Sequence, residues 1–280
     1  MRVLGRATPL LAVAAAAWLA AAAPASAALI AYDGFGGYPA GGGLDSATGG
    51  VGWAGAWAAL DAHVTLQPKT LVDPHGYGDG GPLAVRVQQT QGGSYNQDSI
   101  LRRRFPSTTG ALYVGFLLRV EDFSEWDFLQ IQASDGATGN HDQTLSVGIK
   151  NEPGMPFFAR VGKYENTAYG PPASNDTDYR VVAKLWKDGS ANYNRADLFL
   201  DPQSLIEPAL PTAAAGPKDH GLGSLSLFNL RVYSIEPDDL IFLDEVRVAT
   251  TFSEAMVPEP AGLSLLAVGL LGLARRRRRR

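Results

Sequence analysis

Two acidic residues in the stretch EWDFLQ come nearest to a catalytic arrangement. Glu125 and Asp127 alternate along a predicted strand, so both side chains would lie on one face of it. Hydrolysis of a glycosidic bond with retention of configuration needs two carboxyl groups about 5–5.5 Å apart, one as nucleophile and one as proton donor. The next polar residue, Gln130, has no proton to give up. We therefore interpret the stretch as a strand with alternating acidic residues, and a glycan-degrading hydrolase stays open as the alternative.

Two further carboxylates are candidates for binding a cation. In the strand predicted at residues 240–248, Asp244 alternates with apolar residues, so we expect its side chain to face inward. Pairing of the first and last strands would bring Asp33 close to it. A buried carboxylate must be paired or bind a cation, and calcium prefers several such oxygens. Asp33 and Asp244 therefore form a candidate structural calcium site, with hydrogen bonds from loop amides or pairing with an arginine as the alternative. No other cofactor is predicted.

Tryptophans and arginines are the candidates for binding a ligand. Trp53 and Trp57 lie four residues apart in a glycine-rich loop, where they would either pack the loop or stack on a ligand, and Trp126 lies in a predicted strand. Large aromatic residues in β-sandwiches are usually core anchors. In the run Arg102–Arg104, alternation sends Arg103 to one face and its neighbours to the other. A solvated sheet edge explains this run, and binding of acidic polysaccharide is the alternative.

The segments that would position these residues are short strands separated by clusters of Gly, Pro, Asn, Asp and Ser. No stretch after Ala28 shows the sustained i, i+3, i+4 apolar spacing of a helix, which favours an antiparallel sandwich or barrel in one domain. Residues 179–201 are predicted to form a hairpin. The predicted strands are 29–35, 83–89, 100–105, 111–120, 126–133, 144–150, 157–163, 179–187, 195–201, 225–233 and 240–248.

Alternation is clearest at residues 111–120. Every second residue from Leu112 to Val120 is apolar, and we expect this face of the strand to point into the core.

The N-terminal residues have the order of a secretory signal peptide. Arg2 and Arg6 precede an apolar run, and Ala25-Ser26-Ala27 supplies the small residues that signal peptidase accepts. We predict a signal peptide at residues 1–27, cleavage after Ala27, and export. The chain has no cysteine, which removes thiol nucleophiles and cysteine metal sites from consideration.

The C-terminal residues combine Val257-Pro258-Glu259-Pro260, an apolar segment and the cluster Arg275–Arg280. The apolar segment 261–274 would reach about 21 Å as a helix, short of a hydrocarbon core of roughly 30 Å. This order of parts resembles the PEP-CTERM sorting signal. The resemblance implies that an exosortase processes the protein after signal peptidase has acted. It also implies only transient membrane contact, through this helix.

The charge of the body argues against nucleic acid as a partner. Eight of the 24 basic residues lie in the two terminal segments, and Glu259 is the one acidic residue of the 28 that lies there. Residues 28–257 therefore carry 16 basic and 27 acidic side chains, a net charge of −11. A nucleic-acid-binding domain is typically basic.

Three stretches of the body resemble the concanavalin A-like or laminin-G-like jelly rolls of bacterial surface proteins. They are AYDGFGGYPAGGGL with the following GGVGWAGAW, VVAKLWKDGSANYNRADLFLDP, and FLDEVRVATTFSEA. The resemblance implies an all-β, two-sheet antiparallel jelly-roll sandwich. Retaining β-glucanases with this fold carry Glu-x-Asp-x-x-Glu, and Gln130 stands where that pattern has its general acid.

These observations together predict three segments: a signal peptide (1–27), a jelly-roll domain (28–254) and a sorting signal (255–280). The expected protein is a non-enzymatic surface or matrix protein, with extracellular polysaccharide as its candidate ligand.

Overall fold

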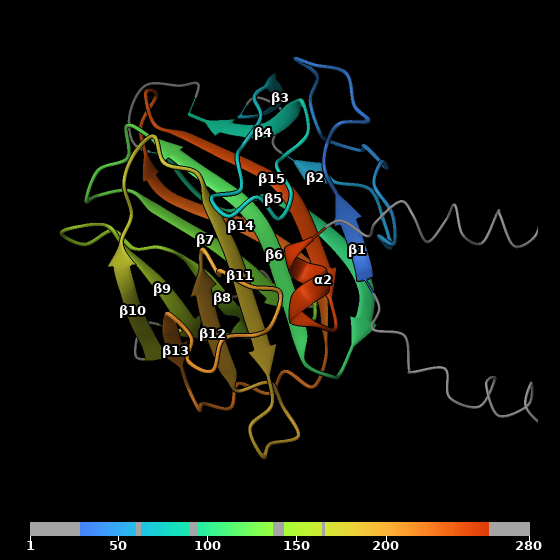
Figure 1. Ribbon diagram of the computed structural model, residues 1–280, viewed down its shortest axis with the longest axis vertical. Coiled ribbons are helices and arrows are strands. Elements are labelled where there is room, and N and C mark those ends of the chain that lie inside the picture. Colours follow the sequence, from blue (N-terminus) through green and yellow to red (C-terminus); the bar gives the residue numbers. More distant parts are fainter. Residues whose placement is uncertain (1–28, 60–62, 90–94, 137–142, 164–165, 258–280) are drawn as a thin grey trace, which may run out of the picture.

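The chain forms two antiparallel β-sheets that pack face to face (Figure 1). The computed structural model describes residues 29–59, 63–89, 95–136, 143–163 and 166–257, and it describes only the backbone of residues 95–99. The predicted all-β, two-sheet antiparallel sandwich is confirmed. The predicted signal peptide and the sorting signal from Pro258 onward lie outside the described residues.

The eight-stranded sheet has the order β13-β12-β11-β6-β15-β4-β3, and β1 also pairs with β15. The first strand therefore pairs with the last, with Asp33 opposite Val246. The strands of this sheet are β1 (Leu29–Asp33), β3 (Val64–Pro68), β4 (Leu83–Gln88), β6 (Leu112–Glu121), β11 (Tyr179–Trp186), β12 (Arg195–Leu200), β13 (Ala213–Ala215) and β15 (Leu240–Ala249).

The seven-stranded sheet has the order β10-β9-β8-β7-β14-β5-β2. Its central strand is β7, and the neighbouring β14 pairs with β7 on one side and β5 on the other. The strands of this sheet are β2 (Ala58–Ala59), β5 (Tyr95–Thr108), β7 (Phe128–Ser134), β8 (Leu145–Ile149), β9 (Pro156–Val161), β10 (Thr167–Pro172) and β14 (Leu225–Ile235).

All eleven predicted strands are present, and β11 and β12 form the predicted hairpin. The four strands β2, β3, β10 and β13 were not predicted. β2 and β13 are only two and three residues of alanine, so they show no alternation of apolar and polar residues. β10, with the sequence TAYGPP, ends in two prolines, which confine it to the edge of the sheet.

The main core lies between the sheets. The alternate residues Leu112 to Val120 of β6 are buried in it, as predicted, against residues such as Leu129, Val147 and Leu230 from the opposite sheet.

The other face of β6 is also buried, because the chain folds back over the eight-stranded sheet. The helix α2 (Phe252–Met256) packs there against Tyr113, Val182 and Phe199 (Figure 1). A Cβ on Gly115 would lie 1.9 Å from the carbonyl oxygen of Ala255, so only glycine allows this close approach.

Residues 71–80, called the covering loop below, close a second part of this outer face. Leu71 packs against Leu117 and Phe242, and Gly80 N–H donates to Leu71 O. Two parts of the outer face of the eight-stranded sheet are thus covered by the chain itself.

The packed body extends to the start of the sorting motif. The boundary predicted after residue 254 falls inside α2, and Arg247 donates a hydrogen bond of 3.0 Å to the carbonyl of Val257. Within the part of the chain that the structure describes, no helix is both long and apolar enough to cross a bilayer.

Candidate functional site

The outer face of the seven-stranded sheet carries polar side chains that come into line through strand register. Asn229 of β14 stands opposite Gln132 of β7, which in turn stands opposite Ser146 of β8. The line extends across six strands, a width of about 24 Å at the usual strand spacing. We call it the polar row, and its members are Arg102, Asn229, Gln132, Ser146, Arg160 and Thr167.

Hydrogen bonds hold several members of the polar row. Asn229 Nδ2 donates to Gln132 Oε1 at 2.8 Å, and Arg160 Nε donates to Thr167 Oγ1 at 2.8 Å. Gln130, two residues before Gln132 on β7, donates through Nε2 to Ser146 Oγ at 2.5 Å. Among the described residues, Gln130 Oε1 and Gln132 Nε2 are buried atoms without a hydrogen-bond partner. Such atoms are uncommon in folded proteins.

Beside the polar row, two stacked rings support two guanidinium groups. The rings of Phe128 and Phe158 are stacked with their centroids 5.6 Å apart and their planes at 15°. The Cζ of Arg160 lies 4.6 Å from the Phe158 centroid, and that of Arg231 lies 5.2 Å from the Phe128 centroid. Cation–π contacts of this kind fix the planes of the guanidinium groups.

A hollow of about 170 Å³ opens on this face, and we call it the lysine hollow. Lys150 stands in its wall, donating to Asn151 Oδ1 at 2.6 Å and lying 3.5 Å from the Glu152 carboxylate. Burial lowers the pKa of Lys150, and Glu152 acts in the opposite direction. The residues that line the hollow are Phe128, Lys150, Asn151, Arg231 and Tyr233.

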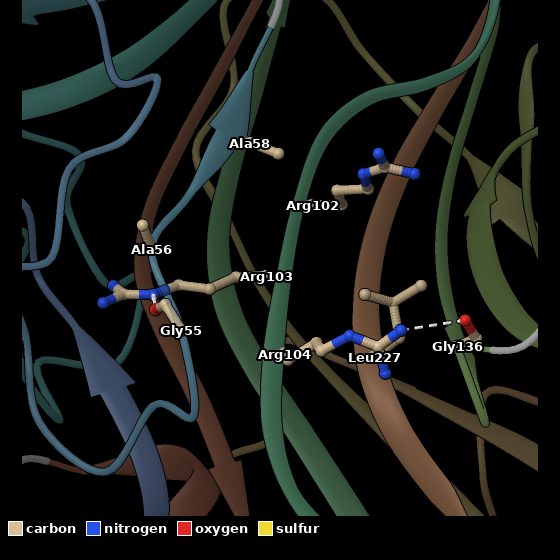
Figure 2. A pocket seen from close by; sticks show the side chains of 8 residues that line it. All are labelled: Gly55, Ala56, Ala58, Arg102, Arg103, Arg104, Gly136 and Leu227. Atoms are coloured by element: carbon tan, nitrogen blue, oxygen red, sulfur yellow. Dashed lines mark hydrogen bonds between the residues drawn. The ribbon is translucent and has the colours of Figure 1, made fainter.

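A second hollow, of about 260 Å³, lies at the β2 and β5 edge, and we call it the arginine hollow. Figure 2 shows Arg102 and Arg104 on one side of β5 and Arg103 on the other, as alternation predicted. Arg102 and Arg104 are exposed, and Arg104 Nη2 donates to the carbonyl of Gly136 at 3.0 Å. The arginine hollow is lined by Gly55, Ala56, Ala58, Arg102, Arg103, Arg104, Gly136 and Leu227.

The carboxylates of EWDFLQ do not share a strand face. β7 begins at Phe128, so Glu125 lies exposed in the preceding turn and Asp127 closes that turn by accepting the Ser124 N–H at 2.5 Å. The prediction that both acids lie on one face of a strand is wrong, because the turn takes up these residues. Gln130 is on the strand, on its outer face.

Asp127 has a second carboxyl group beside it. Burial raises the pKa of Asp239 to about 7, assisted by the nearby Asp127 carboxylate and opposed by the hydrogen bond from the Glu236 N–H. The pKa of Asp127 is likewise raised, chiefly by burial. The two acids join the turn before β7 to the turn before β15.

Asp33 points between the sheets. Its carboxylate accepts hydrogen bonds from Arg103 Nη1 at 2.8 Å, Trp57 Nε1 at 2.8 Å and Tyr38 Oη at 2.6 Å. Arg103 and Asp33 are both almost fully buried, so this ion pair joins the two sheets within the core. Asp33 is therefore paired with an arginine, which the sequence analysis gave as an alternative to calcium binding.

Asp244 lies on the other face of the eight-stranded sheet. A β-bulge at Glu245, which has φ = 54°, shifts the register, so Val246 faces the core while Asp244 lies under the covering loop beside Gly80. The inward alternation predicted for Asp244 fails at this bulge. Burial raises the pKa of Asp244 to about 8, and the Glu245 N–H donates to its Oδ1.

The structure therefore does not bring Asp33 and Asp244 together. Among the described residues, no group of three or more His, Cys, Asp or Glu side chains is arranged to hold a metal ion. Calcium binding by the protein stays a prediction.

The three candidate tryptophans have different surroundings. Trp57 is 1% exposed and packs in the core, so its burial excludes stacking on a ligand. Trp53 is half-buried against Trp57, with ring centroids 5.2 Å apart, and donates to the Tyr32 carbonyl. Trp126 is 70% exposed in the turn before Phe128, where it remains accessible.

The sorting signal is supported by a family comparison. Residues 257–279 match the model of the PEP-CTERM protein-sorting motif. The motif indicates an exported protein that is sorted to the cell envelope. A comparison with curated proteins gives no match.

Solved structures with a similar fold act on or recognise carbohydrates according to their descriptions. An endo-β-1,4-glucuronan lyase from Trichoderma reesei is 15% identical, with 78% of this chain and 97% of that chain covered and a TM-score of 0.46. A β-1,3-glucanase from Mycobacterium marinum is 13% identical, with coverages of 80% and 99% and a TM-score of 0.44. The Emp46p carbohydrate recognition domain is 9% identical, with coverages of 68% and 89% and a TM-score of 0.42. At these identities the likeness concerns the β-sandwich fold alone.

The polar row was not found from the sequence. Its residues belong to six strands spread from Arg102 to Asn229, and only strand register aligns them. Alternation in FLQIQAS and FFARV is a signal that could have placed Gln130, Gln132 and Arg160 away from the core. It gave no indication of which strands are neighbours.

Proposed function

We propose that the protein is a non-enzymatic surface or matrix protein that binds extracellular polysaccharide through the outer face of its seven-stranded sheet. An exosortase would process it at the sorting motif, after transient anchoring by the C-terminal apolar segment. The ligand would then be met outside the cell, in the compartment where the sorting motif delivers the body.

The observation that carries this proposal is the polar row with the two hollows beside it. Amide, hydroxyl and guanidinium groups on neighbouring strands offer the donors and acceptors that sugar hydroxyls require. The buried Gln130 Oε1 and Gln132 Nε2 add an acceptor and a donor in the middle of this face. No helix or strand among the described elements packs over this face, whereas α2 packs on the other sheet.

Binding without cleavage is supported by the placement of the acidic residues. Retaining hydrolysis needs two carboxyl groups facing the bond that is broken. Glu125 and Asp127 lie in a turn, and Asp127 is engaged with Ser124 and Asp239. Gln130, on the face itself, offers an amide in place of an acid.

The test is binding and cleavage measured on the same protein. Full-length chain is titrated with soluble polysaccharides, and each mixture is then assayed for new reducing ends. We expect the protein to bind a polysaccharide. We expect no rise in the number of reducing ends, which hydrolysis or eliminative cleavage would cause. Cleavage abolished by Glu125→Gln would overturn the non-enzymatic function in favour of a glycan-degrading hydrolase.

A pair of variants locates the binding face. Gln132→Ala with Asn229→Ala removes the centre of the polar row, and we expect it to weaken binding about tenfold or more. Gln67→Ala on β3 of the other sheet is the matched control and should bind as the parent does. Circular dichroism verifies that both variants are folded. Equal binding by parent and row variant would reject this face as the site.

Processing is tested separately. Mass spectrometry of protein from its native cells should yield no peptide from Arg275–Arg280. Mature protein that retains this tail would contradict exosortase processing.

A further inference from the structure

We infer that the outer face of the eight-stranded sheet faces the membrane while the protein is anchored, and that exposed aliphatic side chains at residues 204–210 contact the lipid surface there. This inference rests on the transient anchoring in the proposed function, because it states how the body lies while the C-terminal apolar segment is in the bilayer. Residues 204–210 are called the aliphatic loop below.

Exposed large apolar residues are concentrated in the aliphatic loop. Of the eight such residues in the described part of the chain, three are Leu205, Ile206 and Leu210. The side chains of Ile206 and Leu210 are 80% and 83% exposed. Single exposed apolar residues are common on soluble proteins and need no explanation, whereas a group of them marks a contact surface.

The loop is held in place with its charged residue turned inward. Glu207 accepts hydrogen bonds of 2.6 Å from Tyr113 Oη and Lys184 Nζ, which stand opposite each other on the outer face of the sheet. Just before the loop, the Gln203 carbonyl accepts from Tyr77 Oη of the covering loop at 2.6 Å. A loop that faces only water usually has the reverse arrangement, with its charges outward. The outward aliphatic side chains therefore fit an apolar surface.

The described chain ends close to this loop. Tyr113, which donates to Glu207, also meets the ring of Phe252 in α2 edge to face, with centroids 6.2 Å apart. The last described residue, Val257, follows α2 directly. The aliphatic loop and the exit of the chain toward the sorting motif therefore lie on the same side of the sandwich.

The chain between α2 and the apolar segment is too short to let the anchored body move away from the bilayer. From Val257 to Ala261 a fully extended chain spans at most about 14 Å. The segment 261–274 would reach about 21 Å as a helix, less than the roughly 30 Å of the hydrocarbon core. A span shorter than the core draws its flanking residues toward the bilayer. Anchoring therefore keeps α2, and the loop beside it, near the lipid headgroups.

The contact is apolar because the body is acidic. Residues 28–257 carry a net charge of −11, and anionic lipids repel such a body. Glu207 is the one charged residue of the aliphatic loop and is turned inward, so the loop can meet the lipid without this repulsion. A lipid surface requires no directional hydrogen bonds, which favours it over a protein as the partner. The face that we propose for polysaccharide belongs to the other sheet and would point away from the bilayer.

Fluorescent labels at single cysteines measure which face meets the lipid. The chain has no cysteine, so Ile206→Cys and, on the opposite face, Tyr233→Cys each provide one labelling site. The chain from Ala28 to Arg280 is placed in vesicles of phosphatidylcholine and phosphatidylglycerol with a nitroxide lipid, which quenches labels close to the bilayer. We expect quenching at position 206 to be at least about threefold stronger than at position 233. Equal quenching at the two positions would overturn the inference.

A second set of variants tests the aliphatic side chains themselves. Ile206→Gln with Leu210→Gln, combined with a label at Leu205→Cys, should reduce quenching at position 205 about threefold or more. Tyr233→Gln removes an exposed side chain from the opposite face, and this matched control should leave that quenching unchanged. Circular dichroism verifies that the variants are folded. Unchanged quenching in the double variant would contradict a contact made by the aliphatic loop.

Vesicle flotation separates this inference from the proposed function. Failure of the parent protein to float with the vesicles would reject both the anchoring and the contact that depends on it. Flotation without quenching at position 206 would leave the anchoring intact and reject the lipid surface as the partner of the loop. Polysaccharide binding by Ile206→Gln with Leu210→Gln should equal that of the parent, and a loss would contradict the separation of the two faces.

Discussion

Arginines stand on the outer faces of both sheets, but their neighbours differ. On the eight-stranded sheet, Arg180 lies 2.7 Å from Asp73 of the covering loop and Arg247 lies 2.5 Å from Glu245, and all four residues are buried. On the seven-stranded sheet, Arg160 and Arg231 are buried as well, but they lie against phenylalanine rings, and Arg231 lines the lysine hollow.

The difference follows from the cost of removing charge from water. A cation that the chain itself covers is tolerated when a carboxylate is buried with it. The covering loop brings Asp73 to Arg180 and also accepts from Arg180 Nη2 through the Gly78 carbonyl at 2.7 Å. Part of one face of the sandwich is therefore closed by buried ion pairs, and the other face has two hollows lined by basic side chains. The first face contributes to stability, and the second is the face that we propose for ligand binding.

The largest expected effect is on the closed face. Arg180→Met leaves the Asp73 carboxylate buried without its cation, and we expect the free energy of unfolding to fall by about 3–5 kcal/mol. Chemical denaturation at neutral pH measures this change.

The exposed pair Arg195 and Asp188 provides the control. Their side chains are 26% and 44% exposed, so Arg195→Gln should cost less than about 1 kcal/mol. Equal losses from the two variants would show that the covering loop is not held by its buried pair.

The helix α2 closes the same face through apolar contact. Phe252 is 4% exposed and meets the rings of Phe199 and Tyr113 edge to face, with centroids 5.2 and 6.2 Å apart. Phe252→Ala should lower the free energy of unfolding by about 3 kcal/mol. Ser253→Ala, half-buried in the same helix, is the control with little expected change. A small loss for Phe252→Ala would mean that α2 is not part of the stable body.

The closure of this face was only partly predictable from the sequence. Alternation at residues 111–120 correctly assigned Leu112 to Val120 to the core, because one strand face is apolar throughout. The burial of Tyr113 and Leu117 depends on α2 and on the covering loop, which pack through contacts between distant residues. A five-residue helix is too short to give a clear helical period.

The candidate site was less predictable for two physical reasons. Asp244 was assigned to the wrong face because a single bulge at Glu245 reverses the alternation that follows it. Gln132 and Arg160 could be assigned to an outer face, but the order of β7, β8 and β9 in the sheet was needed to align them. Local pattern fixes where a side chain points, and topology decides what it meets.

A pH effect is expected near the open face. Asp239 has its pKa raised to about 7 beside Asp127, so the folded state binds more protons than the unfolded state between about pH 4 and pH 7. Stability from this pair is therefore fully present below about pH 4 and is lost as the pH rises through 7, by at most about 1.4 kcal/mol per pH unit. Asp239→Asn should remove this slope in denaturation curves recorded from pH 5 to pH 8. An unchanged slope would contradict the raised pKa of Asp239 in the folded protein.

The smallest change in stability is expected where the open face meets solvent. Tyr233 lines the lysine hollow and is 41% exposed, whereas Tyr113 under α2 is 6% exposed and donates through its hydroxyl to Glu207 at 2.6 Å. Tyr233→Ala should change the free energy of unfolding by about 0.5 kcal/mol or less, yet weaken polysaccharide binding several-fold. Tyr113→Ala should show the reverse, with a loss of about 3 kcal/mol and unchanged binding by the folded fraction. Denaturation and binding measured on both variants test this crossed pattern. If the two variants behaved alike, the assignment of ligand binding to one face and of stability to the other would be wrong.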